Sequence, residues 1–95
     1  MAYCVCMLAS GRHGTLYVGV TSDLPRRIYE HKEARVEGFT SRYGVTRLVW
    51  YGAHETITEA IAREKALKKW RRDGKTRLIE EMNPEWEDLY LPLNQ

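Results

Sequence analysis

The feature that most constrains the fold of this chain is a short polar turn between two apolar segments. Residues 3–9 form a continuous apolar run and residues 15–20 are mostly apolar, while Ser10-Gly11-Arg12-His13-Gly14 between them contains two glycines. Apolar, β-prone segments joined by a short glycine-containing loop are typical of a β-hairpin. The sequence therefore predicts an antiparallel pair of strands near the start of the chain.

Helix and strand signals alternate after this hairpin. Pro25 suits the first turn of a helix, where its missing N–H costs nothing, and Thr21, Ser22 and Asp23 offer capping oxygens just before it. These signals predict a helix over 24–35. We expect a loop over 36–44, and the β-rich run 45–52 predicts a third strand.

Two further helices follow the third strand. Thr56-x-x-Glu59 is a capping box that opens a long helix reaching about residue 72, which Asp73-Gly74 is expected to end. A shorter helix is predicted over 75–82. The order ββαβαα predicts a single α+β domain over residues 1–95, with the strands in one layer and the helices in another.

Charge is distributed unevenly along the chain, although its net value is only +2. Residues 57–77 hold eight Lys or Arg against three acids, whereas residues 78–95 hold five acids and no base. We therefore assign residues 83–95 to an acidic C-terminal tail. The basic segment fits a face that binds phosphates, and it fits equally well a solvated helix surface.

The N-terminal apolar run also bears on location and on cysteine chemistry. It is far shorter than the ~20 residues of a membrane-spanning helix and lacks the basic start of a signal peptide, so we expect a cytoplasmic protein without a membrane partner. Cys4 and Cys6 point to one face of the predicted strand, in a spacing poorly suited to a disulfide. No other cysteine exists to complete a metal site, so reduced core thiols are expected.

A carboxylate interrupts the apolar stripe of the helix that begins at Ile57. Glu64 lies at the centre of this stripe at 100° per residue. A buried, unpaired carboxylate is costly, so Glu64 should face a cation, a metal or a cleft. The alternative is an ion pair with Lys68 or Arg71 on the same helix face. The apolar residues of the stripe are Ile57, Ala60, Ile61 and Leu67.

Three more polar side chains gather around the turn from the second strand to the first helix. Tyr17 and Gly19 share one face of the strand, which places a phenol beside an open space. Arg27 and His31, four residues apart, share one face of the helix. With Glu64 they supply a phosphate clamp, a proton carrier, a metal ligand and a hydroxyl, which metal-assisted phosphodiester hydrolysis requires.

In their order and spacing these residues resemble the signature of the GIY-YIG nuclease superfamily, and in particular its small stand-alone bacterial branch. The resemblance rests on Tyr17-Val18-Gly19, on Arg27 ten residues after the tyrosine, on His31 one turn later and on Glu64 in a later helix. It implies a three-stranded antiparallel sheet flanked by helices. It also implies a DNA endonuclease that uses one Mg²⁺ or Mn²⁺ ion. No obligatory protein partner is evident in the sequence.

The resemblance further implies a role for each residue. Glu64 would hold the metal ion, and Arg27 would bind the scissile phosphate. Tyr17 would position or deprotonate the attacking water, with support from His31. Asn83 resembles an asparagine that often follows the metal-binding helix in this superfamily.

The chain departs from the family pattern at one position. Cys6 stands where the first motif has its tyrosine, and a thiol is smaller than a phenol and a weaker hydrogen-bond donor. A second hypothesis is therefore a weakly active or inactive module that binds nucleic acid on the same fold. The basic residues expected to contact DNA in either case are Arg26, Arg35, Arg42, Lys68, Lys69, Arg71 and Arg72.

Aromatic residues outside the predicted elements have two interpretations each. Phe39 and Tyr43 could stack on unpaired bases, which predicts a preference for single-stranded or opened DNA, or they could plug the core beneath the loop. Trp86 and Leu89 in the acidic tail could dock onto another protein, or they could pack on the sheet of their own domain.

Overall fold

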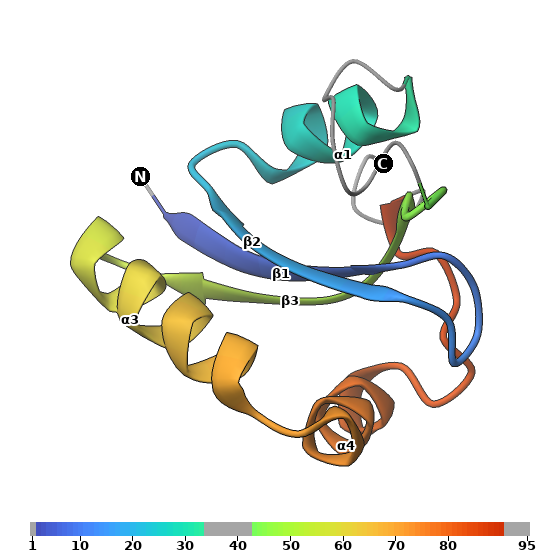
Figure 1. Ribbon diagram of the computed structural model, residues 1–95. Coiled ribbons are helices and arrows are strands. Elements are labelled where there is room, and N and C mark those ends of the chain that lie inside the picture. Colours follow the sequence, from blue (N-terminus) through green and yellow to red (C-terminus); the bar gives the residue numbers. More distant parts are fainter. Residues whose placement is uncertain (1, 34–42, 91–95) are drawn as a thin grey trace.

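The computed structural model describes residues 2–33 and 43–90 and has the predicted element order (Figure 1). The elements are β1 (Tyr3–Ala9), β2 (Leu16–Thr21), α1 (Leu24–Lys32), β3 (Arg47–His54), α3 (Ile57–Lys69) and α4 (Arg72–Met82). The hairpin and the third strand are thus confirmed, with ends shifted by one or two residues. Over the described residues, no helix is long and apolar enough to cross a membrane.

The sheet has three antiparallel strands in the order β2-β1-β3, so β1 lies in the middle. Cys6 pairs with Gly19 of β2 on one side and with Tyr51 of β3 on the other. Residues that are directly opposite in antiparallel strands point to the same face of the sheet. The register therefore decides which side chains meet Cys6.

Helices cover both faces of the sheet, with α1 on one side and α3 and α4 on the other (Figure 1). The expectation of one helix layer is wrong, whereas a sheet flanked by helices is confirmed. The reason lies in β1, whose residues Val5 to Ala9 are all at most 2% exposed. A strand that is apolar on both faces needs a cover on both faces.

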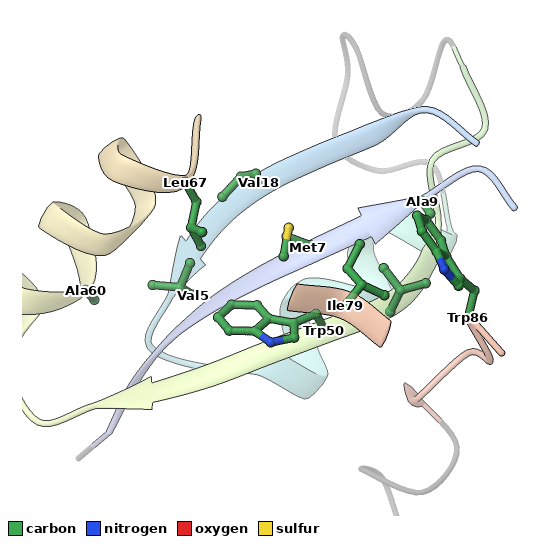
Figure 2. Close-up of a cluster of buried hydrophobic side chains, with 10 residues drawn as sticks. Val5, Met7, Ala9, Val18, Trp50, Ala60, Leu67, Ile79 and Trp86 are labelled. Carbon is green, nitrogen blue, oxygen red and sulfur yellow. The ribbon is translucent and has the colours of Figure 1, made fainter. Parts of the chain in front are cut away.

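Each face has its own core. Figure 2 shows the larger one, in which β1 and its neighbours pack against α3, α4 and the tail. Its buried members are Val5, Met7, Ala9, Val18, Val49, Trp50, Ala60, Leu67, Ile79 and Trp86. The smaller core, beneath α1, consists of Cys6, Leu8, Leu24, Ile28, Val45 and Leu48.

The helix starts follow local capping chemistry. The Asp23 side chain accepts a hydrogen bond from the backbone N–H of Arg26 at 3.3 Å, and Thr56 Oγ1 accepts one from Glu59 at 3.1 Å. Both predicted helix starts are therefore confirmed. Helix α1 ends at Lys32, before the predicted end at residue 35.

The break between α3 and α4 lies earlier than expected. Arg71 is extended, with φ −66° and ψ 157°, and α4 begins at Arg72, so Asp73-Gly74 opens a helix instead of ending one. Asp73 accepts a hydrogen bond from the N–H of Gly74 at 3.0 Å. An acidic side chain in the first turn favours a helix start because it faces the positive end of the helix dipole.

The tail folds back onto its own domain. Trp86 is 0% exposed and its indole N–H donates to Glu80 Oε2 at 2.9 Å. The N–H of Leu89 donates to the carbonyl oxygen of Leu48 at 2.8 Å. The interpretation in which Trp86 and Leu89 dock onto another protein is therefore wrong.

Candidate active site

Tyr17 occupies the space that Gly19 leaves on β2. A Cβ atom added to Gly19 would lie 2.9 Å from Tyr17 Cε2, which is closer than any real Cβ contact. The expected open space beside the phenol is thus filled by the phenol's own ring. Without a side chain, Gly19 leaves this space to the Tyr17 ring, and any larger residue here would force the ring to shift.

His31 comes from α1 to the same side of the sheet. Its side chain is 2% exposed, and its ring centroid lies 5.7 Å from that of Tyr17 with an interplanar angle of 53°. Burial lowers the pKa of His31, the positive charge of Arg27 lowers it further, and Glu30 opposes both. A lowered pKa keeps the imidazole neutral near pH 7, so it can accept a proton.

Cys6 is buried on the sheet face that carries Tyr17, and its thiol is unreactive. Burial raises the pKa of its thiol to about 12, helped by Cys4 and by the negative charge of Glu64, while Arg27 acts in the opposite direction. Cys4 and Cys6 are both free, as expected. Because Cys6 stays protonated, it is neither a nucleophile nor a metal ligand at neutral pH.

Arg27 and Glu64 come from different helices. Arg27 belongs to α1 and Glu64 to α3, which lie on opposite faces of the sheet. Besides burial, both charges influence the pKa of the Cys6 thiol, which Arg27 lowers and Glu64 raises.

Glu64 lies on the packed side of α3, as its position in the sequence predicts. Its side chain is 16% exposed and it pairs with Lys68 at 3.5 Å, so the ion-pair alternative is present in the structure. The apolar stripe is narrower than expected, because Ile57 and Ile61 are 42% and 37% exposed. The buried members are Ala60 and Leu67, one turn on either side of Glu64.

The residues present fit a hard divalent cation with a single protein ligand. Within 2–33 and 43–90 no group of three or more His, Cys, Asp or Glu side chains could hold a metal ion. Mg²⁺ keeps several waters and is often held by one or two carboxylates together with substrate phosphates. Glu64, which now pairs with Lys68, would be that carboxylate, whereas a site for Zn²⁺ would need more nitrogen or sulfur ligands.

Sequence reasoning missed Tyr51. This residue pairs with Cys6 across β1 and β3, is half-buried, and packs against the core beneath α1. It therefore places a second phenol on the face that carries Tyr17. The alternation of side chains along β3 could have indicated its face, but only the register shows that it neighbours Cys6.

Two of the expected site residues have structural roles. Arg72 donates hydrogen bonds to the carbonyl oxygens of His13 and Gly14, which ties α4 to the hairpin loop. Asn83 is 5% exposed, and its amide donates to the carbonyl oxygens of Val49 at 3.1 Å and Glu87 at 2.7 Å. Its polar atoms therefore hold the tail against β3.

The other basic and aromatic candidates are spread over the surface. Lys69 and Arg71 are exposed, as is Arg26, which pairs with Glu30 at 3.6 Å. Tyr43 is 52% exposed, so the interpretation that it plugs the core is wrong. Three further candidates, Arg35, Phe39 and Arg42, lie outside the described residues.

Comparisons with known proteins agree with this arrangement. Residues 2–77 match the model of the GIY-YIG catalytic domain. A UPF0213 protein from Bacillus pumilus is 34% identical over 74 residues, which are 78% of this chain and 76% of the relative. A UPF0213 protein from Staphylococcus aureus is 34% identical over 68 residues, covering 72% of this chain and 83% of the relative.

The fold is also similar to a solved structure. The solution NMR structure of a UPF0213 protein from Bacillus halodurans covers 93% of both chains, with a TM-score of 0.57 and 28% sequence identity. The resemblance found in the order of Tyr17, Arg27, His31 and Glu64 is thereby confirmed, and this chain belongs to the GIY-YIG family.

Proposed function

We propose that this protein is a divalent-metal-dependent DNA endonuclease. The observation that carries the proposal is the packing of the Tyr17 ring beside the His31 ring, 5.7 Å between centroids, in a chain whose residues 2–77 match the GIY-YIG catalytic domain. Arg27 lies one turn before His31 on α1, and Glu64 lies on the packed side of α3. The basic exposed residues of α3 supply contacts to the DNA backbone.

Each residue has a defined task in the proposed hydrolysis. Arg27 binds the scissile phosphate and neutralises the charge that develops on its oxygens. Tyr17 positions the attacking water through its hydroxyl, and the neutral imidazole of His31 accepts a proton from this network. Glu64 would hold Mg²⁺ or Mn²⁺, and the ion would lower the pKa of water and shield the phosphate. Water adds to phosphorus as its proton passes to His31, one P–O ester bond breaks, and the leaving oxygen takes up a proton from solvent.

Cys6 supports a second candidate, a DNA-binding module that does not cut. A protonated, buried thiol cannot replace the hydroxyl of a tyrosine in positioning water. Tyr51 favours activity instead, because its phenol lies beside Cys6 on the same face. If Tyr51 supplies the missing hydroxyl, Tyr51→Phe should lower turnover while Tyr29→Phe, on the exposed part of α1, leaves it unchanged.

One experiment separates the two candidates. The purified protein is incubated with labelled single-stranded, duplex and branched DNA in the presence of Mg²⁺, Mn²⁺ or EDTA. Cleavage that requires the metal and is lost in Arg27→Ala supports the endonuclease. Binding without cleavage under every condition supports the module. A preference for single-stranded or branched substrates would fit a cytoplasmic enzyme of DNA repair or recombination.

A further inference from the structure

A pocket of about 260 Å³ is lined by Trp70, at the end of α3, and by residues of α4. These two helices lie on the sheet face opposite α1 (Figure 1). Trp70, just after α3, forms one wall. The remaining lining residues recur along α4 at the three- and four-residue spacing of one helix face, so they form a continuous floor. These residues are Gly74, Arg77, Leu78 and Glu81.

Trp70 is the tryptophan that the fold leaves at the surface. It is 39% exposed, whereas Trp50 is 8% and Trp86 is 0% exposed. The guanidinium carbon of Arg63 lies 5.2 Å from the centre of its ring, and a Cβ atom at Gly74 would meet Trp70 Cε3 at 3.5 Å. The Arg63 guanidinium therefore lies over the ring, and the missing side chain at Gly74 lets the ring lie close to α4.

The lining of the pocket suits one flat aromatic group with a polar edge. Its volume is just below the ~300–1,000 Å³ of pockets for drug-sized ligands, so it takes a single ring system. Trp70 and Leu78 are apolar walls, Arg77 is a hydrogen-bond donor and Glu81 is an acceptor. Nucleobases combine a stacking face with donors and acceptors along their edge.

The charges beside the pocket indicate how such a base would be presented. Lys68, Lys69 and Arg71 flank Trp70 in the chain, and all three are exposed. Cations next to an aromatic wall fit a base whose own backbone phosphates lie outside the pocket. A free apolar peptide would gain nothing from these cations.

We propose that the pocket at Trp70 binds an unpaired base of single-stranded nucleic acid. The site is separate from the residues around Cys6, and it deepens the proposed function because it rests on DNA being the partner. It would hold one strand on the α4 side of the sheet while another part of the DNA lies at Arg27 and Glu64.

Fluorescence tests this proposal directly, because Trp70 is the exposed tryptophan. In EDTA, a short single-stranded oligodeoxynucleotide should quench the wild-type emission, and an abasic oligomer of the same length should not. The quenching should disappear in Trp70→Phe. By anisotropy, the wild type should bind the base-containing oligomer roughly 5- to 100-fold more tightly than the abasic one. Trp70→Ala should abolish this preference.

Two further variants keep the test decisive if Trp70→Ala does not fold. Glu81→Ala should weaken binding of the base-containing oligomer alone, and Glu85→Ala, outside the pocket, should leave both affinities unchanged. Equal affinity for the two oligomers would overturn the pocket even if Mg²⁺-dependent cleavage is found. Base-dependent quenching without cleavage would uphold the pocket and overturn the endonuclease. Absence of both binding and cleavage would overturn both.

Discussion

Replacement of Glu64 by alanine should abolish cleavage and barely change stability. The ion pair with Lys68 spans 3.5 Å between residues four apart on a helix, and the Lys68 side chain is 53% exposed. Such a pair contributes about 0.3–0.5 kcal/mol. With an unfolding entropy of ~2.1 cal/mol/K per residue, a chain of this length loses about 2 °C in Tm for that amount. Removal of a carboxylate that is 16% exposed relieves a desolvation cost, so the loss should not exceed this figure.

The effect on chemistry should be far larger. A metal ion that shields the phosphate and activates water contributes several kcal/mol in the transition state, so cleavage should fall by about 10³-fold or more. Turnover is measured at saturating DNA with Mg²⁺, and Tm by thermal unfolding followed by circular dichroism.

Two control variants separate the ion pair from the metal site. Lys68→Ala removes the same ion pair but leaves the carboxylate of Glu64, which is 16% exposed, without its cation, so its loss in Tm should be at least as large. Glu85→Ala removes a carboxylate that pairs with Arg12 at 3.1 Å in the tail, and it should leave turnover unchanged. The reasoning is refuted if Glu64→Ala cleaves like the wild type, or if its Tm falls by much more than that of Lys68→Ala.

Three further perturbations test other parts of the site. Arg27→Ala should lower turnover more than it lowers DNA affinity. Arg71→Ala should instead weaken DNA binding and reduce the slope of log affinity against log salt concentration by up to ~1 unit. Equal effects of the two variants on turnover would contradict these roles. Burial lowers the pKa of His31 in the folded chain below the 6.5 of the unfolded chain, so on acidification the unfolded chain binds this proton at a higher pH than the folded chain. The contribution of His31 to stability is therefore complete above about pH 6.5 and falls at lower pH. Thermal unfolding at several pH values should show this loss in the wild type and in His13→Gln, but much less of it in His31→Gln. Tyr43→Ala, at an exposed site, should keep the wild-type Tm and weaken binding to single-stranded DNA relative to duplex DNA. If anisotropy shows the same ratio of the two affinities as in the wild type, Tyr43 does not belong to the binding surface.

Much of the fold follows from signals that act over a few residues. The glycine-bounded turn predicted the hairpin, and the capping oxygens of residues 21–23 and of Thr56 predicted the two helix starts, because caps and turns depend on neighbouring backbone groups. The structure selects Asp23 as the cap of α1. The order and spacing of the motif residues indicated the family for the same reason, since each lies at a regular position on a strand or helix. The inward position of Glu64 was likewise visible in the helical period.

What the sequence could not supply depends on contacts between distant segments. Tyr51 is a neighbour of Cys6 because β1 pairs with β3. Arg72 connects α4 to the hairpin because its side chain donates hydrogen bonds to the carbonyl oxygens of residues 13 and 14. The cover on both faces of the sheet arose because β1 is central and apolar on each side. Residue type and period specify which side chains seek burial, but strand register and helix placement decide which of them meet, and those depend on packing over the whole chain.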